Sequence, residues 1–263
     1  MANRIKWDCT LIDDEPSDLP VYFQHLPEIK HANRGLLWRD CGMERMCLSI
    51  SGLGDWEADG MRIILVRHGE TDENAARRYL GHFDAELNPH GRQQLKRLSE
   101  ILKRTQTETI SAIYSSDLVR AVESAQVIGN EFELRPIPIF DLRELHFGDF
   151  DCKTYEEIKQ EDPERLEKWI LNPYMVAPPN GETLLQLGKR VDDWLETILT
   201  TDQPTGTIVI VSHGGPIRWI LSKWVKGNPN EFWNVEGLGH GKAIMMEWNE
   251  QTRIFTLGKK LEE

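Results

Sequence analysis

Two kinds of segment alternate along the chain from residue 61 onward. In the first kind apolar residues are nearly continuous, as in "MRIILV" at residues 61–66 and "GTIVIV" at residues 206–211. Such runs are typical of strands buried on both faces of a parallel sheet. In the second kind apolar residues recur every three or four positions, which is typical of helices that cover a sheet. The alternation predicts a three-layer α/β fold with helices on both faces of a mostly parallel central sheet.

The pattern places strands in six segments. Two prolines make "RPIPIF" an edge strand, because proline cannot donate to a sheet ladder. The segments "KAIMMEWN" and "RIFTLG" lie close enough in sequence to form a terminal hairpin. The full set comprises residues 61–66, 110–116, 135–140, 206–211, 242–249 and 253–258.

Residue types at the ends of the periodic segments predict where helices begin and end. Asn88 can cap the first helix, and Pro89 suits its first turn. We expect Gly129 to close the second helix, Pro163 to interrupt the third, and Pro216 to start the last. The predicted helices cover residues 92–104, 117–129, 154–171, 183–199 and 216–226.

Residues 1–60 differ from the rest of the chain. They show no sustained periodicity, but they contain Trp7, Trp38 and Trp56, and such aromatic content is unusual for a fully disordered segment. The stretch "SGLGDWEADG", rich in Gly and Asp, then leads to the first strand. We therefore expect an N-terminal extension of unknown role at residues 1–60 and one large domain at residues 61–263.

Composition and charge exclude some classes of partner. Hydrophobic residues make up 40% and charged residues 28% of the 263 positions, as in ordinary globular proteins. The formal net charge of −12 argues against nucleic-acid and anionic-membrane partners, which favour basic surfaces. A small anionic substrate stays compatible, because a few arginines can reverse the field inside one cleft. No apolar run approaches the roughly 20 residues that a membrane-spanning helix needs.

The cysteines and the N-terminus favour a cytoplasmic protein. Cys9, Cys41, Cys47 and Cys152 match no metal or redox spacing, so reduced thiols are expected. A disulfide between Cys41 and Cys47 is an alternative that only their proximity supports. The first residues lack the apolar stretch of a secretory signal.

Polar residues follow three of the predicted strands, in "LVRHG", "IYSSD" and "VIVSHGG". The carboxyl ends of parallel strands meet at one sheet edge, where α/β proteins bind ligands. Arg67, His68, Arg120 and His213 should therefore lie together. Arginine forks suit phosphate, and Gly214 lets backbone approach a ligand at the start of the next helix. Alone each residue would more often be structural, but their joint order favours a site for a tetrahedral oxyanion.

A histidine in such a site can act as a nucleophile. Attack on phosphorus needs a neutral imidazole whose second nitrogen donates to another group, typically a backbone carbonyl. The leaving alcohol needs a proton donor, for which "LRELHFGDFD" offers Glu144, Asp149 and Asp151. Residue type alone does not decide among these three carboxylates.

Six segments, found in the same order, give the chain a specific resemblance. They are "LVRHGETDEN", "YLGHFDAELNPHGRQQ", "IYSSDLVRAVESAQVI", "LRELHFGDFD", "PNGETLLQLGKRV" and "VIVSHGGPIRWIL". With them the chain resembles the histidine phosphatase superfamily, also called the phosphoglycerate mutase-like family. The segments span about residues 61–225, and residues 1–60 lie outside the resemblance. It implies a metal-independent catalytic domain, without a cofactor, at residues 61–263.

The resemblance also implies roles for individual residues. His68 would take the phosphoryl group, and Glu144 would protonate the leaving group and then activate water. The phosphoryl oxygens would be bound by Arg67, Asn74, Arg120, His213 and Gly214. Glu182, in "PNGET", resembles a family carboxylate near the pocket.

The chain departs from the family after "FG", where many members have an aromatic residue followed by Glu-Gly. Here Asp151 and Cys152 stand in those last two positions, which puts the shape of the loop in question. Four other histidines are interpreted as structural or surface residues, although His146 is close enough to Glu144 in sequence to touch substrate. These histidines are His82, His90, His146 and His240.

The substrate is less well defined by the sequence. The short segment between Arg120 and Glu144 is similar to that of small phosphatases rather than glycolytic mutases. "PNGETLLQLGKRVDDWLETI" resembles α-ribazole phosphatases, which remove the 5′-phosphate of α-ribazole phosphate in cobalamin biosynthesis. A broad-specificity phosphatase and a phosphoglycerate mutase are the alternatives.

A different class of function, binding without catalysis, is also considered. A non-enzymatic binding protein is disfavoured because the catalytic set is intact.

A set of aromatic residues could form a lid over an aromatic base or belong to the core: Phe150, Tyr155, Trp169 and Tyr174. We expect a small phosphorylated substrate, and the sequence leaves a homodimer open.

Overall fold

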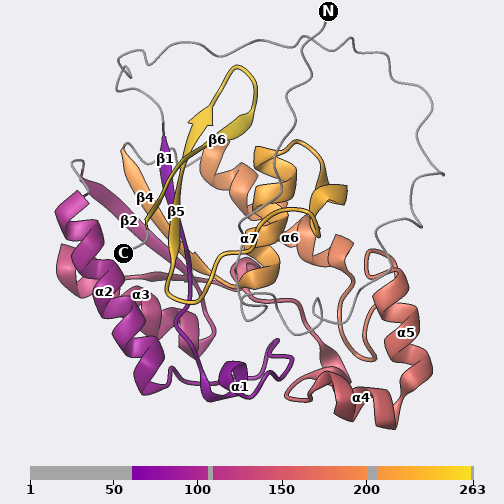
Figure 1. Cartoon of the computed structure of the whole chain (residues 1–263). Helices are drawn as coiled ribbons and strands as arrows, with labels where there is room; N and C mark the ends of the chain where they lie inside the picture. The colour runs from indigo at the N-terminus through magenta and orange to yellow at the C-terminus, as the bar shows by residue number, and fades with distance from the viewer. Residues whose placement is uncertain (1–60, 106–108, 201–205, 262–263) are drawn as a thin grey trace, which may run out of the picture.

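A computed structural model describes residues 61–105, 109–200 and 206–261. Within these ranges it has a six-stranded sheet with strand order β3-β2-β4-β1-β5-β6 (Figure 1). The predicted N-terminal extension and the alternative Cys41–Cys47 disulfide lie outside the described residues. Cys152 is a reduced thiol.

The sheet is mostly parallel, as the sequence predicts. β1 pairs in parallel with β4, which pairs in parallel with β2, and β2 pairs in parallel with β3. β5 runs antiparallel to both β1 and β6, so the predicted terminal hairpin is confirmed. The proline-containing β3 is an edge strand. The strands are β1 Arg62–Arg67, β2 Ile110–Ser116, β3 Ile137–Ile139, β4 Thr207–Ser212, β5 Ala243–Asn249 and β6 Ile254–Leu261.

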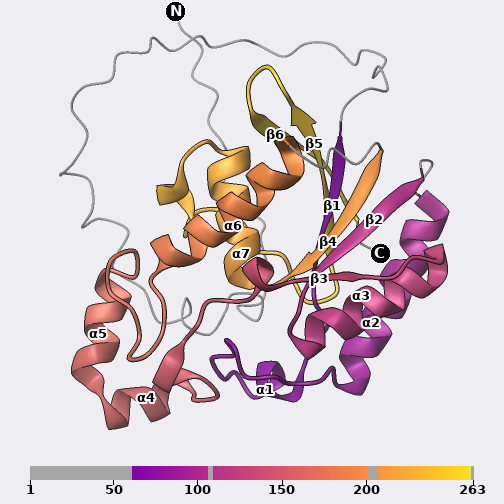
Figure 2. The ribbon, with the colours of Figure 1, turned by 180° about the vertical axis from the view of Figure 1, so that it is seen from behind.

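Helices cover both faces of this sheet (Figures 1 and 2). α2 and α3 pack on one face, and α6 and α7 pack on the other. α1, α4 and α5 lie beyond the carboxyl end of β1 in both views. The helices are α1 Asp72–Ala75, α2 Pro89–Thr105, α3 Val119–Phe132, α4 Tyr155–Glu161, α5 Pro163–Leu171, α6 Leu184–Thr200 and α7 Gly214–Ile220, which continues as a π-helical turn, Leu221–Val225.

Alternate side chains of each central strand serve the two halves of the core. In β1, Ile64 and Val66 pack with the α2 and α3 side, while Ile63 and Leu65 pack with the α6 and α7 side. All four are fully buried, and burying one such side chain contributes about 1.5–3 kcal/mol. The continuous apolar runs in the sequence follow from this burial on both faces.

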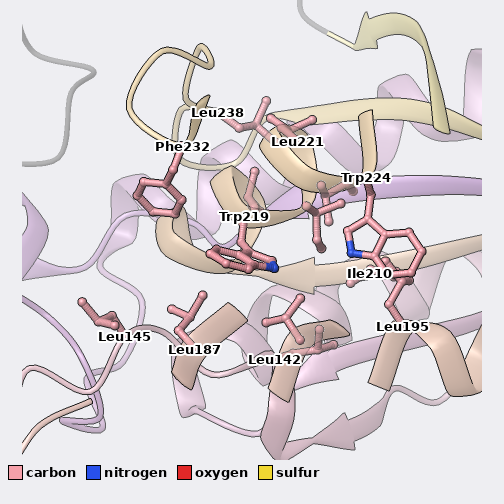
Figure 3. Close-up of a cluster of buried hydrophobic side chains, with 14 of the residues drawn as sticks. Leu142, Leu145, Leu187, Leu195, Ile210, Trp219, Leu221, Trp224, Phe232 and Leu238 are labelled. Carbon is pink, nitrogen blue, oxygen red and sulfur yellow. The ribbon is translucent and has the colours of Figure 1, made fainter. Parts of the chain in front are cut away.

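The α6–α7 side of the core is rich in tryptophan. Figure 3 shows Trp219 and Trp224 packed near Leu187 and Leu195 of α6. The indole N–H groups of Trp219 and Trp224 donate to the buried Asp192 carboxylate at 2.9 and 2.7 Å. This shared acceptor satisfies two buried donors and ties α7 and the following turn to α6.

The predicted helix boundaries are mostly confirmed. The side chain of Asn88 accepts a hydrogen bond from the N–H of Gly91 at 2.7 Å, so it caps α2. Pro163 separates α4 from α5. Gly129 does not close α3, which continues to Phe132, and the expectation was wrong because glycine serves another purpose here. A Cβ atom at Gly129 would lie 2.4 Å from the carbonyl oxygen of Leu134, where the chain folds back.

The start of α7 also differs from the prediction by two residues. The helix begins at Gly214, and Pro216 occupies its first turn, where a missing N–H costs little. Among the helices that the structure describes, none is both long and apolar enough to cross a membrane.

Candidate active site

His68 lies at the carboxyl end of β1, where the backbone is held from both sides. Its N–H donates to the carbonyl of Ser212 on β4 at 3.0 Å. The Nδ1 atom lies 2.7 Å from the carbonyl oxygen of Gly69. Because a carbonyl can only accept, Nδ1 carries the proton and Nε2 is the nitrogen with a lone pair. This is the arrangement that attack on phosphorus requires of a nucleophilic histidine.

The surroundings of His68 keep its ring neutral. The side chain is buried, and burial is the main cause that lowers the pKa of His68 well below its usual value. The positive charges of Arg120 and Arg67 lower this pKa further. A neutral imidazole at physiological pH can attack an electrophile without first losing a proton.

The loop after His68 is locked against two helices. The N–H of Gly69 donates to Ser124 Oγ at 3.1 Å, and this hydroxyl donates to the carbonyl of Arg120 at 2.6 Å. A Cβ atom at Gly69 would lie 2.6 Å from the carbonyl oxygen of Gly91. Glycine is therefore required at position 69 for the close approach of α2, and the nucleophile and Arg120 share one rigid support.

Arg120 supplies a buried positive charge. Its Nη1 donates to the carbonyl of Phe83 at 2.9 Å, and its Nη2 donates to that of Gly81 at 2.6 Å. These partners are neutral, so they orient the guanidinium without neutralising it. Burial lowers the pKa of Arg120 to about 10, which leaves it protonated at neutral pH.

His213 follows β4 directly and faces the nucleophile. Its ring centroid lies 4.9 Å from that of His68. Both ring nitrogens are buried and have no hydrogen-bond partner among the described residues. Burial, followed by the charge of Arg120, lowers the pKa of His213 well below its usual value. Two buried nitrogens without protein partners point to a polar ligand at this place.

Glu144 is the carboxylate that the structure brings to the site. Its Oε1 accepts from the N–H groups of Leu145 at 2.8 Å and Gly215 at 3.0 Å. A Cβ atom on Gly214 would lie 3.6 Å from Glu144 Oε2 and 3.7 Å from Arg67 Nη2, so this glycine borders both groups. Burial raises the pKa of Glu144, although the backbone donors and the nearby arginines lower it. A buried carboxyl with a raised pKa suits a proton donor.

The other two acidic candidates have structural partners. Asp149 accepts from the side-chain amide of Asn180 at 3.0 and 3.1 Å. Asp151 accepts from the N–H of Gly81 at 2.7 Å and of Phe83 at 2.9 Å. It thus fixes the loop whose carbonyls hold Arg120.

The structure also shows how the loop tolerates the loss of the family glycine. Cys152 adopts the left-handed conformation, with φ at 62°, which a glycine would adopt without strain. Its N–H donates to the carbonyl of Tyr79 at 2.7 Å, and the N–H of Tyr79 donates to the carbonyl of Lys153 at 2.8 Å. The pairing holds the loop in shape despite the side chain at position 152.

Glu182 acts on the site through another residue. Its carboxylate forms an ion pair with Arg190 at 2.6 Å and accepts from the N–H of His146 at 3.0 Å. Arg190 also donates to the carbonyl oxygens of Asp141, Arg143 and Glu144 at 2.7, 2.7 and 2.9 Å. Glu182 therefore helps to hold the backbone that carries Glu144, and its contact with substrate stays a prediction.

Asn74 lies in α1, the short helix after the loop that follows His68. Its Oδ1 accepts from the N–H of Thr71 at 3.2 Å, and Thr71 Oγ1 accepts from the N–H of Asn74 at 3.2 Å. This reciprocal cap orients the amide so that its N–H₂ group is the part left for a ligand. Its phosphate contact remains a prediction.

For two of the four aromatic residues that could form a lid or belong to the core, the core alternative is confirmed. Trp169 and Phe150 are buried and pack edge to face with ring centroids 6.0 Å apart. Tyr155 packs partly buried against the same core, and Tyr174 donates to the carbonyl of Pro229 at 2.8 Å. A contiguous core cluster explains their aromatic character.

The four described histidines other than His68 and His213 fall into three environments. His90 is exposed. His82 and His146 are half-buried, with their ring centroids 4.4 Å apart, and His82 Nε2 lies 3.0 Å from the carbonyl oxygen of Glu144. His240 was interpreted as structural or surface, but the structure places its ring centroid 5.3 Å from that of His68. The sequence around it carries no signal for this position, because only the pairing of β5 with β1 brings it there.

Comparison with known proteins identifies the family. The model of the histidine phosphatase superfamily, branch 1, matches residues 63–258. The phosphoglycerate mutase-like protein 4 of Arabidopsis thaliana is 42% identical over 170 residues, 64% of this chain and 72% of that protein. Phosphoserine phosphatase 1 of Hydrogenobacter thermophilus is 31% identical over 194 residues, 74% of this chain and 90% of that protein.

A solved structure of a phosphatase has a similar fold. The α-ribazole phosphatase of Shigella flexneri superposes with a TM-score of 0.70 at 26% identity, covering 77% of this chain and 96% of that one. The buried histidine at the end of β1, the second histidine at the end of β4 and the arginines around them are found in a fold shared with phosphatases. The chain belongs to the histidine phosphatase superfamily.

Proposed function

We propose that this phosphatase hydrolyses small phosphomonoesters without a metal ion, through a phosphohistidine formed on His68. The observation that carries the proposal is the orientation of His68. Its Nδ1–H is held by the Gly69 carbonyl, and its ring lies beside Arg120 and His213. Nε2 is thereby left as a neutral nucleophile close to the positive charges of Arg120 and Arg67.

In the first step, Nε2 of His68 attacks phosphorus. The N–P bond forms while the bond from phosphorus to the ester oxygen breaks. Arg67, Arg120 and His213 bind the phosphoryl oxygens and stabilise the charge that develops on them. Glu144, whose pKa is raised by burial, gives a proton to the leaving oxygen, so that an alcohol departs rather than an alkoxide.

In the second step, the same groups hydrolyse the phosphoenzyme. Glu144, now a carboxylate, takes a proton from water as the water oxygen attacks phosphorus. The N–P bond breaks, inorganic phosphate leaves, and His68 regains its lone pair. The N–H groups of Leu145 and Gly215 stabilise the carboxylate form between the two steps.

Among small phosphomonoesters, we propose α-ribazole 5′-phosphate as the first substrate to test and phosphoserine as the second. The first is supported by the likeness of the chain to the α-ribazole phosphatase of Shigella flexneri, and the second by the likeness to phosphoserine phosphatase 1. The burial of Trp169 and Phe150 removes the aromatic lid as an argument for the first.

The experiment is a substrate panel combined with trapping of the intermediate. Wild type and His68→Ala are incubated with α-ribazole 5′-phosphate, phosphoserine, 3-phosphoglycerate and p-nitrophenyl phosphate, and phosphate release is measured with and without EDTA. Acid-labile phosphate should be trapped on wild type but not on the variant. Turnover by His68→Ala at the wild-type rate, or loss of wild-type activity in EDTA, would reject the proposed chemistry.

A further inference from the structure

The segment that leads into β5 wraps around Arg67 and His68. The carbonyl of Leu238 accepts from Arg67 Nη1 at 2.9 Å, and the carbonyl of Lys242 accepts from the N–H of Arg67 at 3.1 Å. The N–H of Gly241 lies 3.1 Å from the carbonyl oxygens of both Arg67 and His68. The 238–242 segment thus belongs to the support of the nucleophile, and His240 lies in its middle.

The turn at this place fixes the direction of His240. Gly241 has φ at 65°, a conformation that suits glycine. A Cβ atom at Gly241 would lie 2.5 Å from the Cβ of Gln94 on α2, so the turn is closely packed. His240 is therefore preorganised against His68 rather than held in a loose loop.

His240 has an unsatisfied polar atom in this position. Its ring is tilted by 55° relative to that of His68, and its Nε2 is buried without a hydrogen-bond partner among the described residues. Buried polar atoms in folded proteins nearly always have a partner, since leaving one unsatisfied is costly. A residue that served packing alone would avoid this cost with an apolar side chain.

The charges around His240 indicate the kind of partner. Burial is the main cause that lowers the pKa of His240, and the positive charge of Arg67, the proximity of His68 and the charge of Arg120 lower it further. The ring is therefore neutral, and it can donate a hydrogen bond from nitrogen without adding repulsion to a site with two arginines. An oxyanion fits both the arginines and this donor.

We propose that His240 is a third histidine of the phosphoryl site, where its Nε2–H donates to an oxygen of the phosphoryl group bound at His68. The inference rests on the proposed function and adds a residue to it. Arg67, Arg120 and His213 would bind the group from the strand ends and α3, and His240 would bind it from the 238–242 segment.

The test compares His240→Ala and His240→Gln with wild type, with His90→Ala as the control at an exposed histidine. Competitive inhibition by inorganic phosphate and by orthovanadate is measured against p-nitrophenyl phosphate, together with kcat/KM and thermal melting. His240→Ala should raise both inhibition constants about 10- to 100-fold, as expected for one hydrogen bond to a charged group. His240→Gln, which keeps an N–H donor, should recover part of this loss, and His90→Ala should match wild type.

Two results would overturn the assignment. One is a His240→Ala variant with wild-type inhibition constants. The other is an equal loss in the Ala and Gln variants accompanied by a lower melting temperature, which would make His240 a packing residue. Trapping of phosphoenzyme on wild type is run in parallel, because its absence would reject the proposed function while inhibition by phosphate still reports on His240.

Discussion

Replacing Glu144 with Gln separates the structural role of this residue, as a hydrogen-bond acceptor, from its chemical role in proton transfer. The amide oxygen of Gln can still accept from the N–H groups of Leu145 and Gly215, which bind Oε1 at 2.8 and 3.0 Å in the wild type. The side chain keeps its volume in a buried position. The substitution therefore preserves the local structure and removes the carboxyl group that donates a proton in the first step and accepts one in the second.

The size of the effect depends on the leaving group. General acid catalysis contributes about 10²–10⁴-fold, or about 3–5 kcal/mol, when a poor leaving group must be protonated. An alkyl phosphate should lose this full factor in the Glu144→Gln variant. p-Nitrophenolate departs without a proton, so formation of the phosphoenzyme from its ester should slow by less than about tenfold.

Rapid mixing distinguishes the two steps. With p-nitrophenyl phosphate, Glu144→Gln should give a burst of nitrophenolate close to one per enzyme, followed by slow turnover, because the second step also needs Glu144 as the base for water. With phosphoserine the burst itself should be slow. Asp149→Asn is the control, since Asp149 pairs with Asn180 away from these groups.

The pH dependence of the burst gives an independent check. His68 must be neutral and Glu144 must be protonated, and burial lowers the pKa of the first and raises that of the second. With phosphoserine, whose leaving group needs a proton, the wild-type burst rate should fall at low pH as His68 gains a proton and at high pH as Glu144 loses one. Glu144→Gln should lose the high-pH decline and keep the low-pH decline. An equal loss of burst rate for both substrates, or an unchanged high-pH decline, would refute the assignment of Glu144 as proton donor.

The remaining predictions concern the nucleophile, the support of an arginine and the core. His68→Asn should abolish turnover and acid-labile phosphate on the protein, and residual phosphoenzyme would place the nucleophile elsewhere. Asp151→Ala removes the carboxylate that accepts from the N–H groups of Gly81 and Phe83, whose loop orients Arg120. The guanidinium should shift, and kcat/KM should fall about 10- to 100-fold. A wild-type kcat/KM would show that the loop keeps its shape without Asp151. Gly188→Ala would place a Cβ 2.1 Å from a ring carbon of Trp219, and overpacking of about 1–3 kcal/mol should lower the melting temperature by several degrees. An unchanged melting temperature would mean that the indole relaxes at little cost.

Local signals in the sequence were sufficient for most of the framework. Continuous apolar runs predicted β1 and β4, which are buried on both faces, and Asn88 marked the start of α2. The strand-end positions of His68 and His213 also predicted that they would meet, and their ring centroids lie 4.9 Å apart. These inferences succeeded because burial and capping act over a few neighbouring residues, and because parallel strands must place their carboxyl ends together.

Other features depended on contacts between distant parts of the chain. Residue type alone could not choose Glu144 over Asp149 and Asp151, and only the resemblance pointed to Glu144. The structure buries Glu144 beside Gly215, 71 positions away, and this burial raises the pKa of Glu144. The ion pair of Glu182 with Arg190 was likewise not evident from the sequence. Residue type does not show which polar partner a side chain will meet after folding.

The sequence by itself determined the order of strands and helices, the family and the residues that meet at the strand ends. Only the tertiary structure decided that the 238–242 segment reaches Arg67, through a contact that spans 171 positions, and that His240 lies against His68. The physical reason is that apolar periodicity records which face of an element is buried. The identity of the neighbour on that face is set by how strands pair across the sheet, here by β5 running antiparallel beside β1.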